Sequence, residues 1–232
     1  YLVETIVFFS HVLFAMAWVG GTASMQSIML ALDVHSLASA SFISGAVTLA
    51  KIVGTFIAAW IAIRLGIKYA FFVSSLLITI GLLTPYAPNY ELLLLSRFLM
   101  GLGGAFMVVY FNPIVLQFFK ADERSTINGI NAVAFNIGTA IILWQMQSIN
   151  QLTGSWQNSL ALFSILSLVV ALLWLLVKFE QPATATKDLD TLPEIYSYQQ
   201  GLKDRFNWLY GLAYSGILAF YICLFTFYPK AG

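Results

Sequence analysis

Charged residues are scarce in this chain, and their scarcity excludes most classes of soluble protein. Only 9% of the residues are Asp, Glu, Lys or Arg, and 60% are hydrophobic; a soluble domain has about 25% charged residues. The net charge of +1 comes from connecting segments and gives no sign of nucleic-acid binding. The single cysteine, Cys223, permits no internal disulfide and fits no multi-cysteine metal pattern. We expect a membrane protein with no metal site, no cofactor and no enzymatic activity.

Long hydrophobic runs stand where a soluble protein would carry its charges. A helix needs about 20 apolar residues to cross the hydrocarbon core of a bilayer. Seven segments are close to that length or exceed it: residues 5–32, 38–63, 69–86, 92–118, 125–148, 157–177 and 206–228. The charged residues inside them are Lys51 and Arg97, and His11 adds an imidazole. The sequence therefore predicts an all-α protein that crosses the membrane several times.

Basic residues gather on one side of the predicted spans. The connections after the second, fourth and sixth spans hold Arg64, Lys68, Lys120, Arg124, Lys178, Lys187, Lys203 and Arg205. The connections after the first, third and fifth spans hold no Lys or Arg, and Lys230 follows the seventh span. Cytoplasmic loops carry an excess of Lys and Arg. We therefore expect the N-terminus and the even-numbered connections to be cytoplasmic.

The first three spans and the next three are copies of one unit. A shift of 84 residues places 43–60 over 127–144 with seven identical residues, and it pairs Phe14 with Phe98 and Gly20 with Gly104. Because each copy has three spans, the second copy begins on the opposite side of the membrane from the first. The copies, about 5–86 and 92–177, are therefore predicted to be inverted, as in secondary transporters.

The connection after the second span holds Arg64, Gly66 and Lys68 at spacings of two residues. These residues resemble the G-x-L-x-D-R-x-G-R-K signature of the major facilitator superfamily. Ala59, Ile63 and Ile67 stand where that signature has Gly, Asp and a basic residue, so the charge latch that the Asp would form is in doubt. The fourth span begins with the pattern R-x-x-x-G-x-G, in Arg97, Gly101 and Gly103.

This resemblance implies an organisation for the whole chain. Members of the family carry two six-helix halves joined by a cytoplasmic loop. Residues 1–179 would be the N-terminal half, 180–205 the linker, and 206–232 the seventh helix, which begins the C-terminal half. The resemblance implies a secondary transporter whose further partners are the rest of the C-terminal half, a lipid bilayer and a small solute.

Lys51 is the most informative residue for function. It lies about 18 Å of helical rise from Ile63, at the cytoplasmic end of its span. That depth is near the bilayer midplane, where a charge is costly and usually faces a cavity or a partner. The repeat equivalent of Lys51 is Phe135, so the cation belongs to one copy only. We predict that Lys51 binds substrate; the alternative is a lysine satisfied by carbonyls or hydroxyls.

Arg97 and His11 are the other two candidates inside the spans. Arg97 lies about 9 Å from the start of its span, and Asn112 continues its helical face; it would bind substrate or tie helix ends together. His11, with Trp18 and Thr22 on its face, is a candidate for proton coupling because its usual pKa lies near neutrality. The alternative for His11 is a hydrogen-bonded packing residue.

The remaining site candidates are polar or aromatic. Asn131 in the fifth span either hydrogen-bonds the solute or joins helices. Tyr214, in an aromatic stripe of the seventh span, either faces a cavity or packs. The full set of predicted substrate contacts is Lys51, Arg97, Trp18, Thr22, Asn112, Asn131 and Tyr214.

The charges within the spans favour an anionic solute. No Asp or Glu is expected deep in any span, since Glu4 and Asp33 flank the first and Glu91 begins the fourth. A buried cation needs an anion, and Lys and Arg suit a carboxylate or phosphate. We therefore predict transport of a small organic or inorganic anion by alternating access, in a bacterial inner membrane.

Other functions stay open. Efflux of drugs or metabolites, and proton-coupled uptake of a neutral or zwitterionic nutrient, are the alternatives among transporters. A seven-helix receptor is disfavoured by the three-helix repeat and by the cytoplasmic N-terminus expected from the basic connections.

Overall fold

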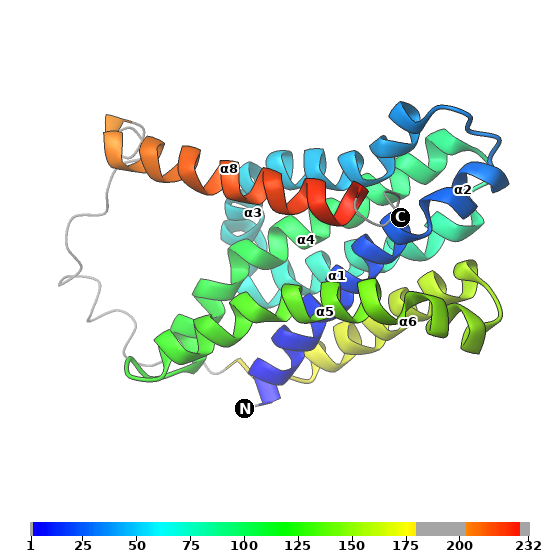
Figure 1. The fold of residues 1–232 in the computed structure, drawn as a ribbon. Coiled ribbons are helices and arrows are strands. Elements are labelled where there is room, and N and C mark those ends of the chain that lie inside the picture. Colours follow the sequence, from blue (N-terminus) through cyan, green and yellow to red (C-terminus); the bar gives the residue numbers. More distant parts are fainter. Residues whose placement is uncertain (1, 180–202, 228–232) are drawn as a thin grey trace. The chain divides into compact units, whose positions relative to one another are not determined.

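The structure is a computed structural model that describes residues 2–179 and 203–227. All regular elements of these residues are helices: α1 (Leu2–Ala23), α2 (Met25–Ala31), α3 (Leu37–Thr79), η1 (Ile80–Tyr86), α4 (Tyr90–Phe118), α5 (Arg124–Thr153), α6 (Trp156–Leu175) and α8 (Arg205–Phe227). The chain forms two units, residues 1–178 and 179–232. The first unit holds α1 to α6, and α1 passes through it between α3 and α4 on one side and α5 and α6 on the other (Figure 1).

Five helical stretches of the described residues are long and apolar enough to cross a membrane. They contain the first six predicted spans, because the stretch Ala38–Tyr86 holds two of them. The first span is shorter than predicted: α1 ends at Ala23, and the residues up to Ala31 form the separate short helix α2. The seventh predicted span forms α8, and its membrane crossing stays a prediction.

Gly66 breaks α3 into two limbs. Its backbone has φ 75° and ψ 155°, a combination that essentially only glycine adopts. The break separates the second and third predicted spans at the glycine of the loop motif. Beside it, the Arg64 guanidinium lies 5.4 Å from the Trp60 ring centroid, and Lys68 Nζ donates to the Val177 carbonyl at 2.8 Å.

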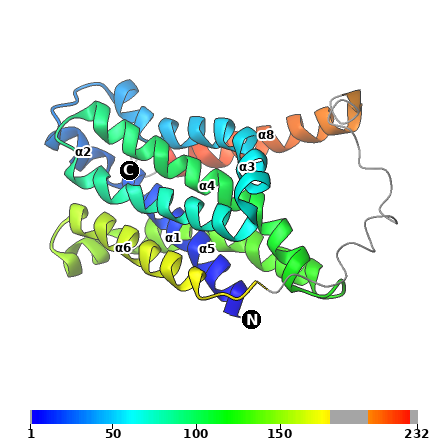
Figure 2. The ribbon, with the colours of Figure 1, turned by 180° about the vertical axis from the view of Figure 1, so that it is seen from behind.

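Contacts between α1 and α4 show that these equivalent helices run in opposite directions. Along α1, His11 contacts Phe111, Phe14 lies against Gly104, and the Ala17 carbonyl accepts from Arg97. As the number rises on α1, it falls on α4, so the helices are antiparallel. The two copies are therefore inverted, as predicted from the repeat (Figure 2 shows this unit from behind).

The two copies interlock through glycines at equivalent positions. Gly54 on α3 lies against Ala105 of α4, and its repeat equivalent Gly138 on α5 lies against Ala15 of α1. In each case a Cβ on the glycine would come within 2.8 Å of the alanine Cβ. The first helix of each copy therefore packs on the second helix of the other copy.

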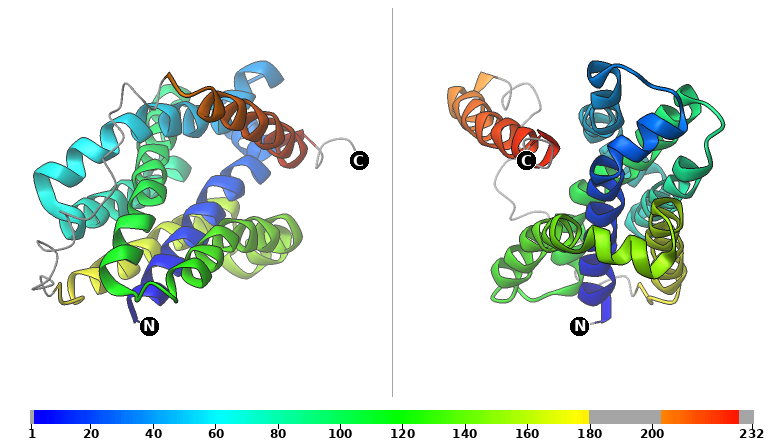
Figure 3. Two further views of the ribbon diagram at one scale, coloured as in Figure 1. Left: turned by 90° about the vertical axis from the view of Figure 1, so that its left-hand side faces the viewer. Right: turned by 45° about the vertical axis from the view of Figure 1, so that its right-hand side comes forward.

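Two glycines of the R-x-x-x-G-x-G motif fit α4 between the limbs of α3. A Cβ on Gly101 would lie 2.8 Å from the carbonyl oxygen of Val47, in the first limb. A Cβ on Gly103 would lie 2.5 Å from the carbonyl oxygen of Ser74, in the second limb, where the Ser74 hydroxyl donates to Gly103 O at 2.6 Å. The long limbs and their neighbours are seen from two further directions in Figure 3.

Candidate functional site

The Lys51 ammonium lies beside two aromatic rings. Its Nζ is 4.8 Å from the ring centroid of Trp18 on α1 and 5.6 Å from that of Phe135 on α5. Both distances are within the range of a cation–π interaction. Within the described residues, the Lys51 side chain makes no hydrogen bond and no ion pair. The charge is therefore held by ring faces and has no anionic partner in this part of the chain.

The indole next to Lys51 is fixed in place. Trp18 is 2% exposed, and its Nε1 donates to the hydroxyl of Ser44 at 3.2 Å. Ser44 lies on α3, two helical turns before Lys51, and the centroid of the Phe135 ring is 5.4 Å from that of the indole. Neither Ser44 nor Phe135 was predicted as a site residue. Ser44 could have been found because it lies seven residues before Lys51 on the same helical face, and Phe135 because the 84-residue repeat pairs it with Lys51.

Lys51 and Phe135 occupy equivalent positions in the two copies, 84 residues apart, and yet they touch. Residues that contact their own equivalent lie beside the axis that exchanges the copies. For inverted copies this axis lies in the membrane plane. The rings around Lys51 are therefore at the centre of the repeat.

Arg97 is held in a different way. It is 1% exposed, and its guanidinium donates to three backbone carbonyls: Nε to Ile43 at 3.1 Å, Nη1 to Ala17 at 2.9 Å and Nη2 to Trp18 at 2.7 Å. These bonds join α4 to α1 and α3. Of the two roles considered for Arg97, the geometry favours the one that ties helices together.

Glu4, which was expected to flank the first span, is buried in the first turn of α1. It belongs to α1, is 8% exposed, and its Oε2 accepts from Asn131 Nδ2 at 3.3 Å. His11 is 7% exposed, and its Nδ1 lies 3.3 Å from the backbone carbonyl oxygen of Asn131. Asn131 therefore joins α5 to α1. Glu4 was not predicted as a site residue because it was placed at the edge of the first span.

The other predicted contacts of the first unit have partners other than Lys51 or are exposed. Thr22 is 3% exposed, and its hydroxyl donates to the Trp18 carbonyl at 3.3 Å, next to Arg97. Asn112 is exposed on α4. Tyr214 is exposed within the second unit, where its ring stacks on that of Tyr210. Of the predicted set, Lys51 and Trp18 form a contact pair.

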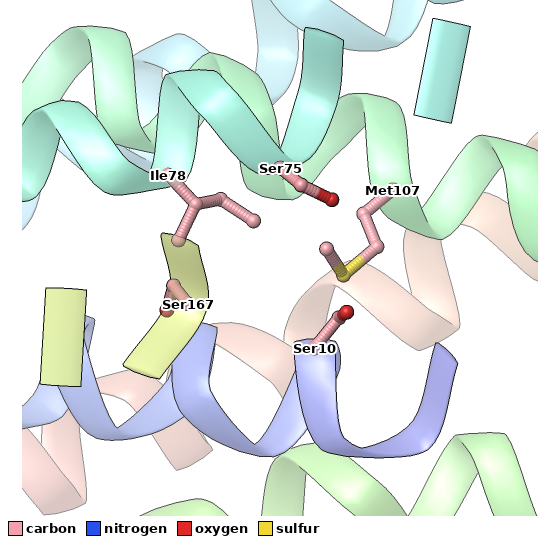
Figure 4. A pocket seen from close by; sticks show the side chains of 5 residues that line it. All are labelled: Ser10, Ser75, Ile78, Met107 and Ser167. Atoms are coloured by element: carbon pink, nitrogen blue, oxygen red, sulfur yellow. The ribbon is translucent and has the colours of Figure 1, made fainter. Parts of the chain in front are cut away.

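A small pocket elsewhere in the unit is a packing feature. It is lined by Ser10, Ser75, Ile78, Met107 and Ser167, from α1, α3, α4 and α6 (Figure 4). Each serine hydroxyl donates to a carbonyl one turn earlier on its own helix. The space is too narrow for a water molecule. It is therefore no binding site for a solute.

The inverted repeat and the central lysine are features of a membrane transporter, and comparison with known proteins gives its family. The sequence pattern of the Major Facilitator Superfamily matches residues 7–231. This chain belongs to the Major Facilitator Superfamily, a family of membrane transporters, as predicted from its motifs and its inverted repeat.

The chain is also similar to individual proteins in sequence or in fold. The chain is 29% identical to an uncharacterized protein of Campylobacter jejuni over 230 residues, which are 98% of this chain and 69% of that protein. It is also 29% identical to human protein spinster homolog 1 over 119 residues, 51% of this chain and 22% of that protein. Its fold is similar to a crystal structure of a D-xylose-proton symporter, with a TM-score of 0.65 and 15% identity, over 82% of this chain and 52% of the symporter chain.

Proposed function

We propose that this chain supplies the N-terminal half of a transporter that carries a small anion by alternating access, with Lys51 as the principal solute contact. One observation supports the proposal most directly: Lys51 contacts its own repeat equivalent, Phe135, and has no anionic partner in the described residues. A cation without a counter-ion at the centre of an inverted repeat attracts a carboxylate or phosphate that enters from either side.

The aromatic rings beside Lys51 favour a solute that has an apolar part as well as an anionic group. The cation–π contacts reduce the cost of holding the ammonium in the membrane while no solute is bound. They leave its three N–H donors free for an oxyanion. The indole of Trp18, held by Ser44, would form a flat wall beside a bound carboxylate. Organic anions with an apolar portion fit this surface well.

A complete transport cycle requires a second half. The chain spans 69% of the Campylobacter relative and 52% of the symporter chain. We propose that the full-length protein has a C-terminal half that begins with α8, and that rocking of the two halves exposes Lys51 alternately to each side. The excess of basic residues in the even-numbered connections supports a cytoplasmic N-terminus, and a bacterial inner membrane is the proposed location.

Uptake by the full-length protein in proteoliposomes tests this proposal. Radiolabelled benzoate, succinate and inorganic phosphate serve as probes, each with wild type, Lys51→Ala and Lys51→Arg. We expect one probe to be taken up by wild type, at least tenfold less by Lys51→Ala, and at an intermediate rate by Lys51→Arg, because the two cations differ in geometry. Equal uptake by wild type and Lys51→Ala would refute the role of Lys51.

Proton-coupled uptake of a neutral or zwitterionic solute is the second candidate. The buried carboxyl of Glu4 favours it, because a carboxyl in a membrane helix is a common proton carrier. Uptake of a labelled sugar or amino acid that is driven by an inward proton gradient, and is unaffected by the three anions, would decide for this candidate.

A further inference from the structure

Two oxygen atoms at the α1–α5 contact have no donor. Glu4 Oε1 and Asn131 Oδ1 are fully buried and make no hydrogen bond within the described residues. Both belong to side chains already linked through Glu4 Oε2 and Asn131 Nδ2. A buried acceptor without a donor costs free energy. Two such acceptors on one hydrogen-bonded pair indicate that one of the two side chains binds an additional proton.

A proton on Glu4 supplies that donor. The carboxylate has acceptors only, whereas the protonated acid has one O–H donor. An acid and a primary amide can pair through two hydrogen bonds: amide N–H to one acid oxygen, and acid O–H to the amide oxygen. Protonation of Oε1 would complete this pair with Asn131 Oδ1 and would remove a negative charge from a buried position.

His11 belongs to the same group. It lies two helical turns after Glu4 on α1, and its Nδ1 faces the Asn131 backbone carbonyl. A carbonyl only accepts, so Nδ1 carries the hydrogen. The ring of Phe135 lies 5.6 Å from the His11 ring and 5.6 Å from Lys51 Nζ. The group is therefore joined to the Lys51 site through one aromatic ring.

The charged residues on the surrounding helices leave Glu4 without a cation of its own. Arg97 is bonded to three carbonyls, Lys68 to Val177, and Arg124 at the start of α5 to the carbonyls of Phe119 and Leu116. Lys51 lies over Trp18 and Phe135. Arg64 lies over Trp60, Glu91 is exposed, and α2 and α6 carry no charged residue. No salt bridge neutralises the Glu4 carboxylate within the described residues.

We propose that Glu4, Asn131 and His11 form a proton-binding site, in which Glu4 takes up one proton from water and Asn131 holds the resulting acid against α5. The step is the addition of one proton to one carboxylate, with no other bond broken. The site goes beyond anion binding by Lys51 and does not depend on it.

Infrared difference spectra of the purified full-length protein in lipid, between acidic and alkaline buffer, test the proposal without any solute. Glu4→Gln retains the shape of the acid and keeps an N–H donor. We expect a carboxylic acid C=O band in wild type that is lost in Glu4→Gln and retained in Glu91→Gln, a matched change at an exposed position of α4.

A second variant, Asn131→Asp, is expected to keep the carboxylic acid band and to shift its pH midpoint. Asn131→Asp places two carboxyls together, so that they share one proton, and the pH midpoint of the band should rise by at least one unit. A band unchanged in Glu4→Gln, or a midpoint unmoved in Asn131→Asp, would overturn the proposal. Because the readout is the proton itself, a failure of anion uptake by Lys51→Ala leaves this result unaffected, and the two proposals can fail separately.

Discussion

The two cations inside the first unit, Lys51 and Arg97, are satisfied in opposite ways. The Arg97 guanidinium donates to three backbone carbonyls on two other helices and is 1% exposed. The Lys51 ammonium lies over two rings and makes no hydrogen bond within the described residues. Sequence position alone gives both the same description: a basic residue in a hydrophobic run.

The difference between them supports a structural role for Arg97 and the functional role proposed for Lys51. Guanidinium has five donors in a rigid fork and suits several fixed carbonyls at once. Ammonium is a compact charge that keeps its donors available when it contacts ring faces. Arg97 therefore stabilises the helix arrangement, and Lys51 is available to a ligand. Each prediction below tests or refines this contrast.

Substitution of Arg97 should have the largest effect on stability. In Arg97→Met, the carbonyls of Ile43, Ala17 and Trp18 lose a charged donor, and a hydrogen bond to a charged group is worth about 1.5–3 kcal/mol. We expect a loss of at least about 3 kcal/mol and little folded protein. Lys51→Met should fold as well as wild type. Size-exclusion chromatography and thermal unfolding of the two detergent-solubilised variants measure this difference in stability. Equal stability of Arg97→Met and Lys51→Met would contradict the structural role of Arg97.

The α1–α5 contact offers a smaller change with a matched control on the same helix. A Cβ at Gly138 would lie 2.8 Å from that of Ala15, whereas one at Gly129 meets nothing within 4 Å. Gly138→Ala should cost about 1–3 kcal/mol through overpacking, and Gly129→Ala should stabilise the helix by up to about 1 kcal/mol. Thermal unfolding gives both values. Equal shifts of the same sign would show that α5 does not pack closely on α1.

Ser44→Ala should have the smallest effect, and that effect should be on the site around Lys51. It removes the acceptor of the Trp18 indole N–H, a hydrogen bond worth about 1 kcal/mol. The indole should become more mobile, so that the KM for the transported solute rises a few-fold while the maximal rate changes little. Kinetics of uptake measure both. Ser41→Ala, an exposed change on the same helix, is the control and should leave the KM unaltered.

The sequence predicted the fold well because its signals are periodic and local. The 84-residue offset indicated inverted copies, and α1 and α4 are antiparallel. Gly66 in the loop motif adopts the backbone conformation that requires glycine. Gly101 and Gly103 fit α4 against the two limbs of α3. Each of these features can be recognised in the sequence from a residue type or from the spacing of residues.

The site was harder to predict because its partners are distant in sequence or carry no side-chain signal. The three acceptors of Arg97 are backbone carbonyls, which any residue could provide. Glu4 pairs with Asn131, 127 residues away, and only the packing of α1 on α5 brings them together. Lys51 could be identified as important because a charge in a hydrophobic span is costly wherever it points. The rings of Trp18 and Phe135 could not be identified as its partners, because they lie on other helices.

Accessibility of position 51 to water-soluble reagents tests the central claim most directly. In a background of the full-length protein in which every native cysteine, Cys223 included, is replaced by serine, Lys51→Cys is compared with Ala134→Cys, a fully buried position on α5. We predict that an anionic, membrane-impermeant thiosulfonate labels Lys51→Cys in membranes and leaves Ala134→Cys unlabelled, because position 51 lies on the solute path. Labelling of Lys51→Cys by lipid-soluble maleimides alone would place it against lipid and contradict the account.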